Sequence, residues 1–150
     1  MTPDASAHIE VAAPPQRVFD LVSDLRRLGG VAEEYSGGRW LRGSGPSVGA
    51  RFRGLNRRGW RMWPTVSTIT DCSVTRFAFD VRSLGMMVSR WQYDIEPTEN
   101  GCRVTESTWD RRPGWYKPIT VLATGVRDRA VTNQANIEAT LARLKQAAES

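Results

Sequence analysis

The sequence predicts an α+β fold in which a curved antiparallel sheet of seven strands packs against a long C-terminal helix. Apolar or small residues recur every three or four positions from Val126 to Ala148, which is the period of one helical face. Most of the preceding chain consists of short alternating segments separated by turn residues, which is typical of strands. The 150 residues are enough for one domain with a substantial core, so we expect residues 1–150 to form a single domain.

The C-terminal helix is predicted over residues 118–148. If it is unbroken it is about 46 Å long, at about 1.5 Å per residue. Its apolar stripe includes a single amide, Asn133, and two small residues, Gly125 and Ala130, lie near its first half. The full stripe consists of Val126, Ala130, Asn133, Ile137, Leu141, Leu144 and Ala148. A helix with so little bulk in its first half leaves space below it, so we expect a cavity between the helix and the sheet.

The other elements follow from local patterns. Alternation predicts a first strand at residues 7–11, and Pro14-Pro15 begins a helix at 16–23. Asp24 can cap a second short helix that reaches residue 28, before Gly29-Gly30. Six further strands are predicted at 38–42, 49–56, 60–70, 74–81, 87–95 and 102–109. In the strand at 60–70, one face carries Met62, Pro64 and Val66 and the other carries Trp63 and Ile69. A bulge near Pro64 is expected to reconcile the two faces.

Composition excludes several classes of function. No apolar run is long enough to span a bilayer, and the first residues lack the pattern of a secretory signal, so we expect a cytoplasmic protein. The one histidine, His8, is predicted on the outer face of its strand, which argues against Ser-His-Asp and Cys-His catalysis. Cys72 and Cys102 have no CxxC spacing and are expected to be reduced packing residues. No cofactor and no metal site is predicted.

Three segments carry a resemblance to a known family. They are an opening strand that runs into an Ala-Pro-x-x-x-Val-Phe helix at 9–24, the start of the last strand at 101–105, and the end of the C-terminal helix at 141–145. The chain resembles the START-like superfamily, also called SRPBCC or Bet v 1-like, and within it the polyketide cyclase/dehydrase and lipid-transport group. The resemblance implies a helix-grip fold with two short helices between strands one and two and a cavity between sheet and helix. Family members bind lipids, sterols, polyketides, plant hormones or quinones, and some catalyse cyclisation or dehydration.

Strand alternation predicts which side chains face this cavity. Phe77 and Phe79 share one face of their strand, and Trp91 and Tyr93 share one face of the next. The helix contributes Asn133 and Ile137 from its stripe. The amide of Asn133 could hold a ligand, or could equally bond to a sheet backbone group or to water. We therefore expect an aromatic, mostly apolar pocket.

Glu106 is the candidate catalytic residue. If Val104 faces inward then Glu106 does too, and an apolar cavity disfavours the ionised form of a carboxyl group. Glu106 would then act as an acid, a base or a hydrogen-bond partner of a ligand. Two alternatives remain: Glu106 pairs with an arginine such as Arg90, or a bulge turns it outward and brings Trp109 inward.

A basic segment lies between residues 51 and 63. Five arginines (Arg51, Arg53, Arg57, Arg58 and Arg61) are interleaved there with Phe52, Trp60 and Trp63. Arginines on the outer face of a hairpin are ordinarily solvated. Weak contact with a membrane surface is the main alternative, and nucleic-acid binding is less favoured.

The leading functional hypothesis is the binding of a small hydrophobic ligand such as a lipid or polyketide, without a cofactor or metal. Two alternatives stay open. One is a polyketide cyclase or dehydratase that uses Glu106, Tyr93 and Asn133. The other is a quinone-binding chaperone, a role that the resemblance implies for one branch of the superfamily.

Overall fold

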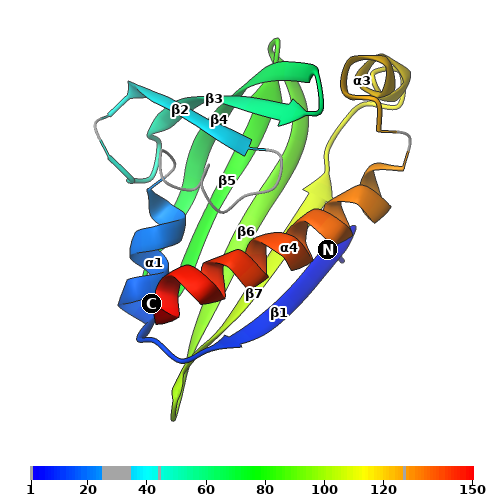
Figure 1. The fold of residues 1–150 in the computed structure, drawn as a ribbon. Helices are drawn as coiled ribbons and strands as arrows, with labels where there is room; N and C mark the ends of the chain where they lie inside the picture. Colours follow the sequence, from blue (N-terminus) through cyan, green and yellow to red (C-terminus); the bar gives the residue numbers. More distant parts are fainter. Residues whose placement is uncertain (1, 25–34, 44, 127) are drawn as a thin grey trace.

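The computed structural model describes residues 2–24, 35–43, 45–126 and 128–150. Over these residues the strands form one seven-stranded antiparallel sheet in the order β1-β7-β6-β5-β4-β3-β2 (Figure 1). The strands are β1 Ala5–Val11, β2 Tyr35–Arg42, β3 Arg51–Arg58, β4 Arg61–Ser73, β5 Arg76–Ser83, β6 Met86–Thr98 and β7 Gly101–Asp110. The helices are α1 Pro15–Ser23, α3 Lys117–Thr124 and α4 Arg129–Glu149. This arrangement confirms the predicted helix-grip fold.

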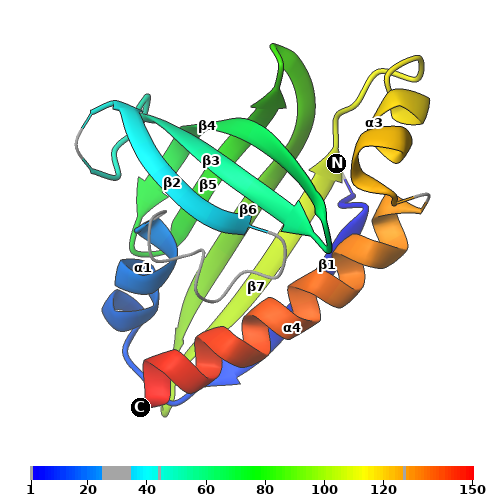
Figure 2. The ribbon, with the colours of Figure 1, turned by 45° about the horizontal axis from the view of Figure 1, so that its top comes forward.

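The sheet curves around α4, which crosses its concave side (Figures 1 and 2). Helix α4 also satisfies the open edge of β1, where backbone groups would otherwise lack partners. The Gln134 side chain accepts a hydrogen bond from the Ser6 amide and donates one to the Ser6 carbonyl, at 3.1 and 3.0 Å. Further along, the Lys145 ammonium group donates to the Glu10 carbonyl at 2.8 Å. The helix is thereby fixed along the same edge that begins the chain.

One half of the concave face is filled by the core. Helix α1 buries Val18 and Val22 there, and its Phe19 ring meets the Phe77 ring edge-on at 6.4 Å between centroids. The second half of α4 adds Leu141 and Leu144, both almost fully buried. Of the second short helix predicted at 24–28, all residues but Asp24 lie outside the described residues.

The C-terminal helix is divided into α3 and α4, so the condition of an unbroken helix from Pro118 is not met. Gly125 ends α3 in the left-handed conformation, with φ of 75°, and its amide bonds to the Val121 carbonyl at 2.8 Å. Helix α4 begins after Asp128, whose carboxylate accepts a hydrogen bond from the Val131 amide. Ala130 is exposed, so the buried stripe within α4 starts at Asn133.

The bulge predicted near Pro64 is wrong. Strands β3 and β4 pair in an unshifted register that places Leu55 opposite Pro64. Trp63, Thr65, Ser67 and Ile69 therefore share the concave face by plain alternation, and the side chain of Met62 is 54% exposed. The irregularity of β4 lies between Ile69 and Asp71, against β5, and it bends a long strand around the core.

Candidate functional site

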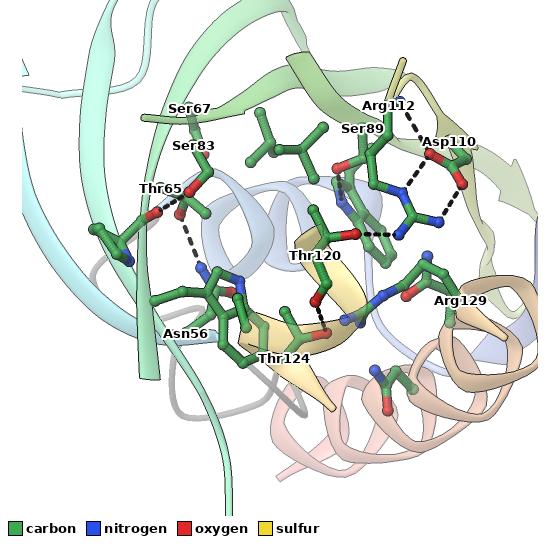
Figure 3. A pocket seen from close by; sticks show the side chains of 18 of the residues that line it. Asn56, Thr65, Ser67, Ser83, Ser89, Asp110, Arg112, Thr120, Thr124 and Arg129 are labelled. Atoms are coloured by element: carbon green, nitrogen blue, oxygen red, sulfur yellow. Dashed lines mark hydrogen bonds and ion pairs between the residues drawn. The ribbon is translucent and has the colours of Figure 1, made fainter. Parts of the chain in front are cut away.

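The predicted cavity lies between the concave face and the helices, with a volume of about 240 Å³. Its walls come from strands β3 to β7 and from α3 and α4. Figure 3 shows polar side chains of the wall bonded to one another; for example, the Asn56 amide donates to the Thr65 hydroxyl at 2.8 Å. On β6, the indole N–H of Trp91 donates to the Ser89 hydroxyl at 3.0 Å. Most polar atoms in these walls are thus already engaged.

Five of the seven residues predicted from the sequence line this cavity. They are Phe79, Trp91, Tyr93, Glu106 and Asn133. The structure places Phe77 and Ile137 elsewhere, because both are fully buried in the core and neither lines the cavity. Phe77 is separated from it by its packing against α1, and Ile137 lies on the part of α4 that touches the sheet.

Glu106 is held inside the cavity wall by the register of three strands. Its Cα lies opposite Tyr93 on β6 and Ala7 on β1, and the residue is only 3% exposed. Its Oε1 atom has no hydrogen-bond partner in the described part of the chain. Burial raises the pKa of Glu106 to about 8, although the hydrogen bond with Tyr93 opposes this rise. At neutral pH Glu106 is therefore mostly an uncharged carboxylic acid.

Both alternatives for Glu106 are contradicted by the structure. Arg90 lies on the opposite face of the sheet, where its guanidinium group bonds to Thr70, Asp80 and Asp71 at 2.7 to 3.4 Å. Strand β7 pairs with both of its neighbours without a register shift, so no bulge turns Glu106 outward or Trp109 inward.

Tyr93 is the neighbour that completes this buried pair. Burial, followed by the nearby Glu106 charge and the hydrogen bond to Glu106, holds the pKa of Tyr93 well above its usual range. Its hydroxyl group therefore keeps its proton. The pair combines a phenol that donates to the carboxyl group with a carboxyl oxygen that has no partner among the residues that the structure describes.

Helix α4 presents a polar stripe to the cavity, of which only Asn133 is predicted from the sequence as a site residue. The stripe consists of Arg129, Asn133, Asn136 and Thr140, at intervals of four, three and four residues. That spacing places them on one helical face and could have been found from the sequence. In the sequence the polar stripe is hard to recognise, because it lies beside the apolar stripe formed by Ile137, Leu141 and Leu144.

A second polar group lies toward α3 and was also missed. The Arg112 side chain is 8% exposed and bonds to both carboxylate oxygens of Asp110, at 2.9 and 2.6 Å, and to the Thr120 hydroxyl at 2.6 Å (Figure 3). Burial tends to raise the pKa of Asp110, but the hydrogen bonds and charge of Arg112 outweigh it and hold that pKa below its usual value. The Arg112 charge is thus already balanced.

Among the described residues, no three His, Cys, Asp or Glu side chains come together in a way that could hold a metal ion. Both cysteines are free thiols, with Cys102 buried and Cys72 half-buried. The described ranges contain no helix long and apolar enough to cross a membrane. The arrangement can enclose an apolar molecule and offer one proton donor or acceptor at Glu106.

Similar folds are known in several solved structures. The polyketide-cyclase-like protein Cgl2372 of Corynebacterium glutamicum is 28% identical, with a TM-score of 0.63, and the match covers 94% of this chain and 88% of that one. The di-domain ARO/CYC protein StfQ of the steffimycin biosynthetic pathway is 13% identical, with a TM-score of 0.74 over 96% of this chain. The di-domain ARO/CYC protein BexL of the BE-7585A pathway is 20% identical, with a TM-score of 0.71 over 97% of this chain. The chain spans about half the length of both di-domain proteins, at 49% of each.

Sequence comparison gives a more specific result than fold similarity alone. No match was found among curated protein sequences. The sequence profile described as polyketide cyclase/dehydrase and lipid transport matches residues 2–149, which is almost the whole chain. The chain belongs to the polyketide cyclase/dehydrase and lipid transport family.

Proposed function

We propose that the protein binds a small, uncharged hydrophobic molecule in the cavity and holds one oxygen atom of that molecule with Glu106. The observation that carries this proposal is the buried Oε1 atom of Glu106, for which residues 2–24, 35–43, 45–126 and 128–150 supply no hydrogen-bond partner. A buried polar atom without a partner costs free energy, of the order of 1–3 kcal/mol, so a ligand that supplies the missing hydrogen bond recovers that cost.

The charge state of Glu106 selects the kind of oxygen. With its pKa at about 8, Glu106 is mostly protonated at neutral pH and can donate to a ketone, quinone or ester carbonyl. A ligand carboxylate at the same place would lie beside Glu106, whose own carboxyl group loses its proton near pH 8. The Arg112 charge is balanced by Asp110 and offers such an anion little compensation. The Asn133 amide, across the cavity on α4, provides a further donor and acceptor.

The size of the cavity is consistent with a ligand of one or two rings, or with one end of a longer molecule. The cavity volume of about 240 Å³ is slightly below the ~300 Å³ at which pockets for drug-sized ligands usually begin. Aromatic walls from Phe79, Trp91 and Trp63 favour flat ligands.

The test uses two probes of nearly the same shape, the ketone acetonaphthone and the anion naphthoate. We expect the wild-type protein to prefer acetonaphthone at neutral pH, and its affinity for the ketone to fall as the pH rises through about 8, because Glu106 loses its donor proton. Glu106→Gln keeps a donor and should remove this pH dependence, whereas Glu106→Leu should weaken ketone binding at every pH. Tighter binding of naphthoate, or no response to either substitution, would refute the proposal.

The ligand itself can be sought by mass spectrometry of the natively purified protein, intact and after organic extraction. Because Ile137 lies in the core, a variant meant to fill the cavity should instead change Thr140, which lines it. Thr140→Phe should lose a co-purified molecule, and Ala135→Phe, at an exposed position of α4, is the matched control that should retain it.

A second candidate is an enzyme of the cyclase or dehydratase type. It is favoured by one observation, a carboxyl group whose pKa of about 8 allows it to exchange a proton near neutral pH beside a bound carbonyl. The two di-domain neighbours are described as ARO/CYC proteins of biosynthetic pathways, which is compatible with this alternative. Turnover that falls in Glu106→Gln while ligand affinity survives would favour the enzyme, and a change in affinity alone would favour the binding protein. A co-purified quinone would instead favour the quinone-binding chaperone.

A further inference from the structure

The end of the molecule around the cavity mouth exposes an unusual number of large apolar side chains. We call this area the mouth surface, and it comprises the turn between β3 and β4, the turn between β5 and β6, and the segment 111–124 that includes α3. Both views place these three segments at the end of the molecule away from α1 and the C-terminus (Figures 1 and 2). Its exposed apolar side chains are Trp60 at 80%, Leu84 at 85%, Trp115 at 64%, Ile119 at 50% and Leu122 at 80%.

These side chains border the cavity directly. Leu84 and Ile119 line the cavity and are also exposed to solvent, so the opening lies between the β5–β6 turn and α3. The β3–β4 turn adjoins the other end of α3, since a Cβ atom added at Gly125 would lie 2.8 Å from the Arg61 guanidinium group. That group also stacks over the Trp60 ring at 4.4 Å. The apolar residues therefore surround a passage into an apolar interior.

The mouth surface is also basic. The sequence has no Asp or Glu within 51–70, 81–93 or 111–127, the three stretches that contain the mouth surface. Exposed basic residues there are Arg57, Arg58, Arg111 and Lys117, with the partly buried Arg61 beside them. The carboxylates that flank segment 111–127 are engaged, Asp110 by Arg112 and Asp128 by the first turn of α4. At the opposite end of the sheet, by contrast, acidic residues are present: Glu99 lies in the β6–β7 turn and Glu96 lies near the end of β6.

We propose that the mouth surface docks on the surface of an anionic lipid bilayer, with Trp60, Leu84 and Leu122 entering the headgroup region and the cavity opening toward the lipid. Exposed aliphatic and tryptophan side chains gain by entering an interface, and flanking arginines and lysines are attracted to anionic headgroups. Nucleic acid is a poorer partner for this surface, because a phosphate backbone gives Leu84, Ile119 and Leu122 no apolar phase to enter. Docking itself is argued from the exposed apolar and basic side chains alone. It rests on the proposed function in one respect, namely that the molecule exchanged with the membrane through the mouth would be the hydrophobic ligand of the cavity.

The test is co-sedimentation of the full chain with two kinds of vesicle, phosphatidylcholine alone and phosphatidylcholine with phosphatidylglycerol in equal parts. We expect binding to the anionic vesicles only, weakened by added salt because the charges at the interface are exposed. Replacing Arg57 and Arg58 together by Gln should weaken binding about 30-fold, at roughly 1 kcal/mol for each charge near the surface. Leu122→Ser and Trp60→Ser should each weaken it about tenfold or more, since a buried apolar side chain is worth roughly 1.5–3 kcal/mol.

Matched controls are available elsewhere on the chain. Val48→Ser changes another exposed apolar residue, in the β2–β3 loop, and Arg103→Gln removes one positive charge on β7, far from the mouth surface; both should leave vesicle binding unchanged. Leu122 and Trp60 do not line the cavity, so their variants should bind acetonaphthone as the wild type does. Equal binding to neutral vesicles, or an equal loss in Val48→Ser, would overturn the proposal. So would binding to a DNA or RNA oligonucleotide that depends on Arg57 and Arg58 but not on Leu122. Because ketone binding is measured separately, loss of membrane docking leaves the proposed function standing.

Discussion

The protonation of Glu106 makes a prediction about folding stability that needs no ligand. Because its pKa is about 8 in the folded protein and about 4.5 for an ordinary glutamate, the folded state binds the proton more tightly than the unfolded state. The corresponding stability is fully present below about pH 4.5 and is lost as the pH rises to about 8. Over these roughly 3.5 pH units, at about 1.4 kcal/mol per unit, the loss amounts to about 5 kcal/mol.

Glu106→Gln isolates this contribution, because glutamine cannot ionise and every other titrating group is shared with the wild type. The free energy of unfolding of the variant minus that of the wild type should rise by about 1.4 kcal/mol per pH unit between about pH 5 and about pH 8. Urea unfolding followed by circular dichroism at several pH values measures the difference. Glu99→Gln makes the same substitution in an exposed turn and should give a constant difference. A constant difference for Glu106→Gln as well would refute the buried, protonated state from which the proposed function starts.

Three further substitutions test the structure around the site. Gly101→Ala should destabilise the fold by roughly 2 kcal/mol or more, because Gly101 has φ of +149° and the added Cβ would lie 2.1 Å from the Val11 carbonyl oxygen. Urea unfolding measures the loss, and the control is Gly114→Ala, whose added Cβ meets nothing within 4 Å. Asp128→Ala should cost about 1 kcal/mol by removing the cap of α4, and Asp128→Asn should retain most of that stability. Arg112→Met should cost about 3 kcal/mol because it leaves the Asp110 carboxylate without the guanidinium group that balances its charge, and adding Asp110→Asn should restore part of the loss in a double-mutant cycle.

The strands could be predicted because each has one face on an apolar core, and alternation then fixes the face of every residue. Glu106 is an example: Val104 must face inward, so the residue two positions later does too, and the structure confirms it. The break after α3 could not be predicted in the same way. The apolar stripe continues through Gly125 to the buried Val126, so periodicity alone gives no sign that the backbone leaves the helix there.

Alternation also fails to say where along a strand the cavity begins. Phe77 and Phe79 point to the same face of β5, and only Phe79 lines the cavity, because α1 covers Phe77. Similarly, Asn133 and Ile137 are one helical turn apart on α4, yet Asn133 lines the cavity whereas Ile137 is fully buried in the core. These differences depend on how far the sheet curves and on where α1 packs, and both are set by tertiary contacts.

The polar stripe of α4 explains why the cavity stays open beside such an apolar wall. An aliphatic stripe would pack on the sheet as Leu141 and Leu144 do. Asn133 and Thr140 are already buried beside the cavity, and closing it would press their polar groups against apolar side chains of the sheet. We therefore expect Asn133→Leu to raise the free energy of unfolding by about 1 kcal/mol and to weaken acetonaphthone binding, a trade of ligand affinity for stability. Urea unfolding and ketone titration of the same preparation measure both quantities. A variant that was less stable and bound the ketone normally would contradict this explanation. The Asn133 amide would then stabilise the fold, and a feature other than the polar stripe would keep the cavity open.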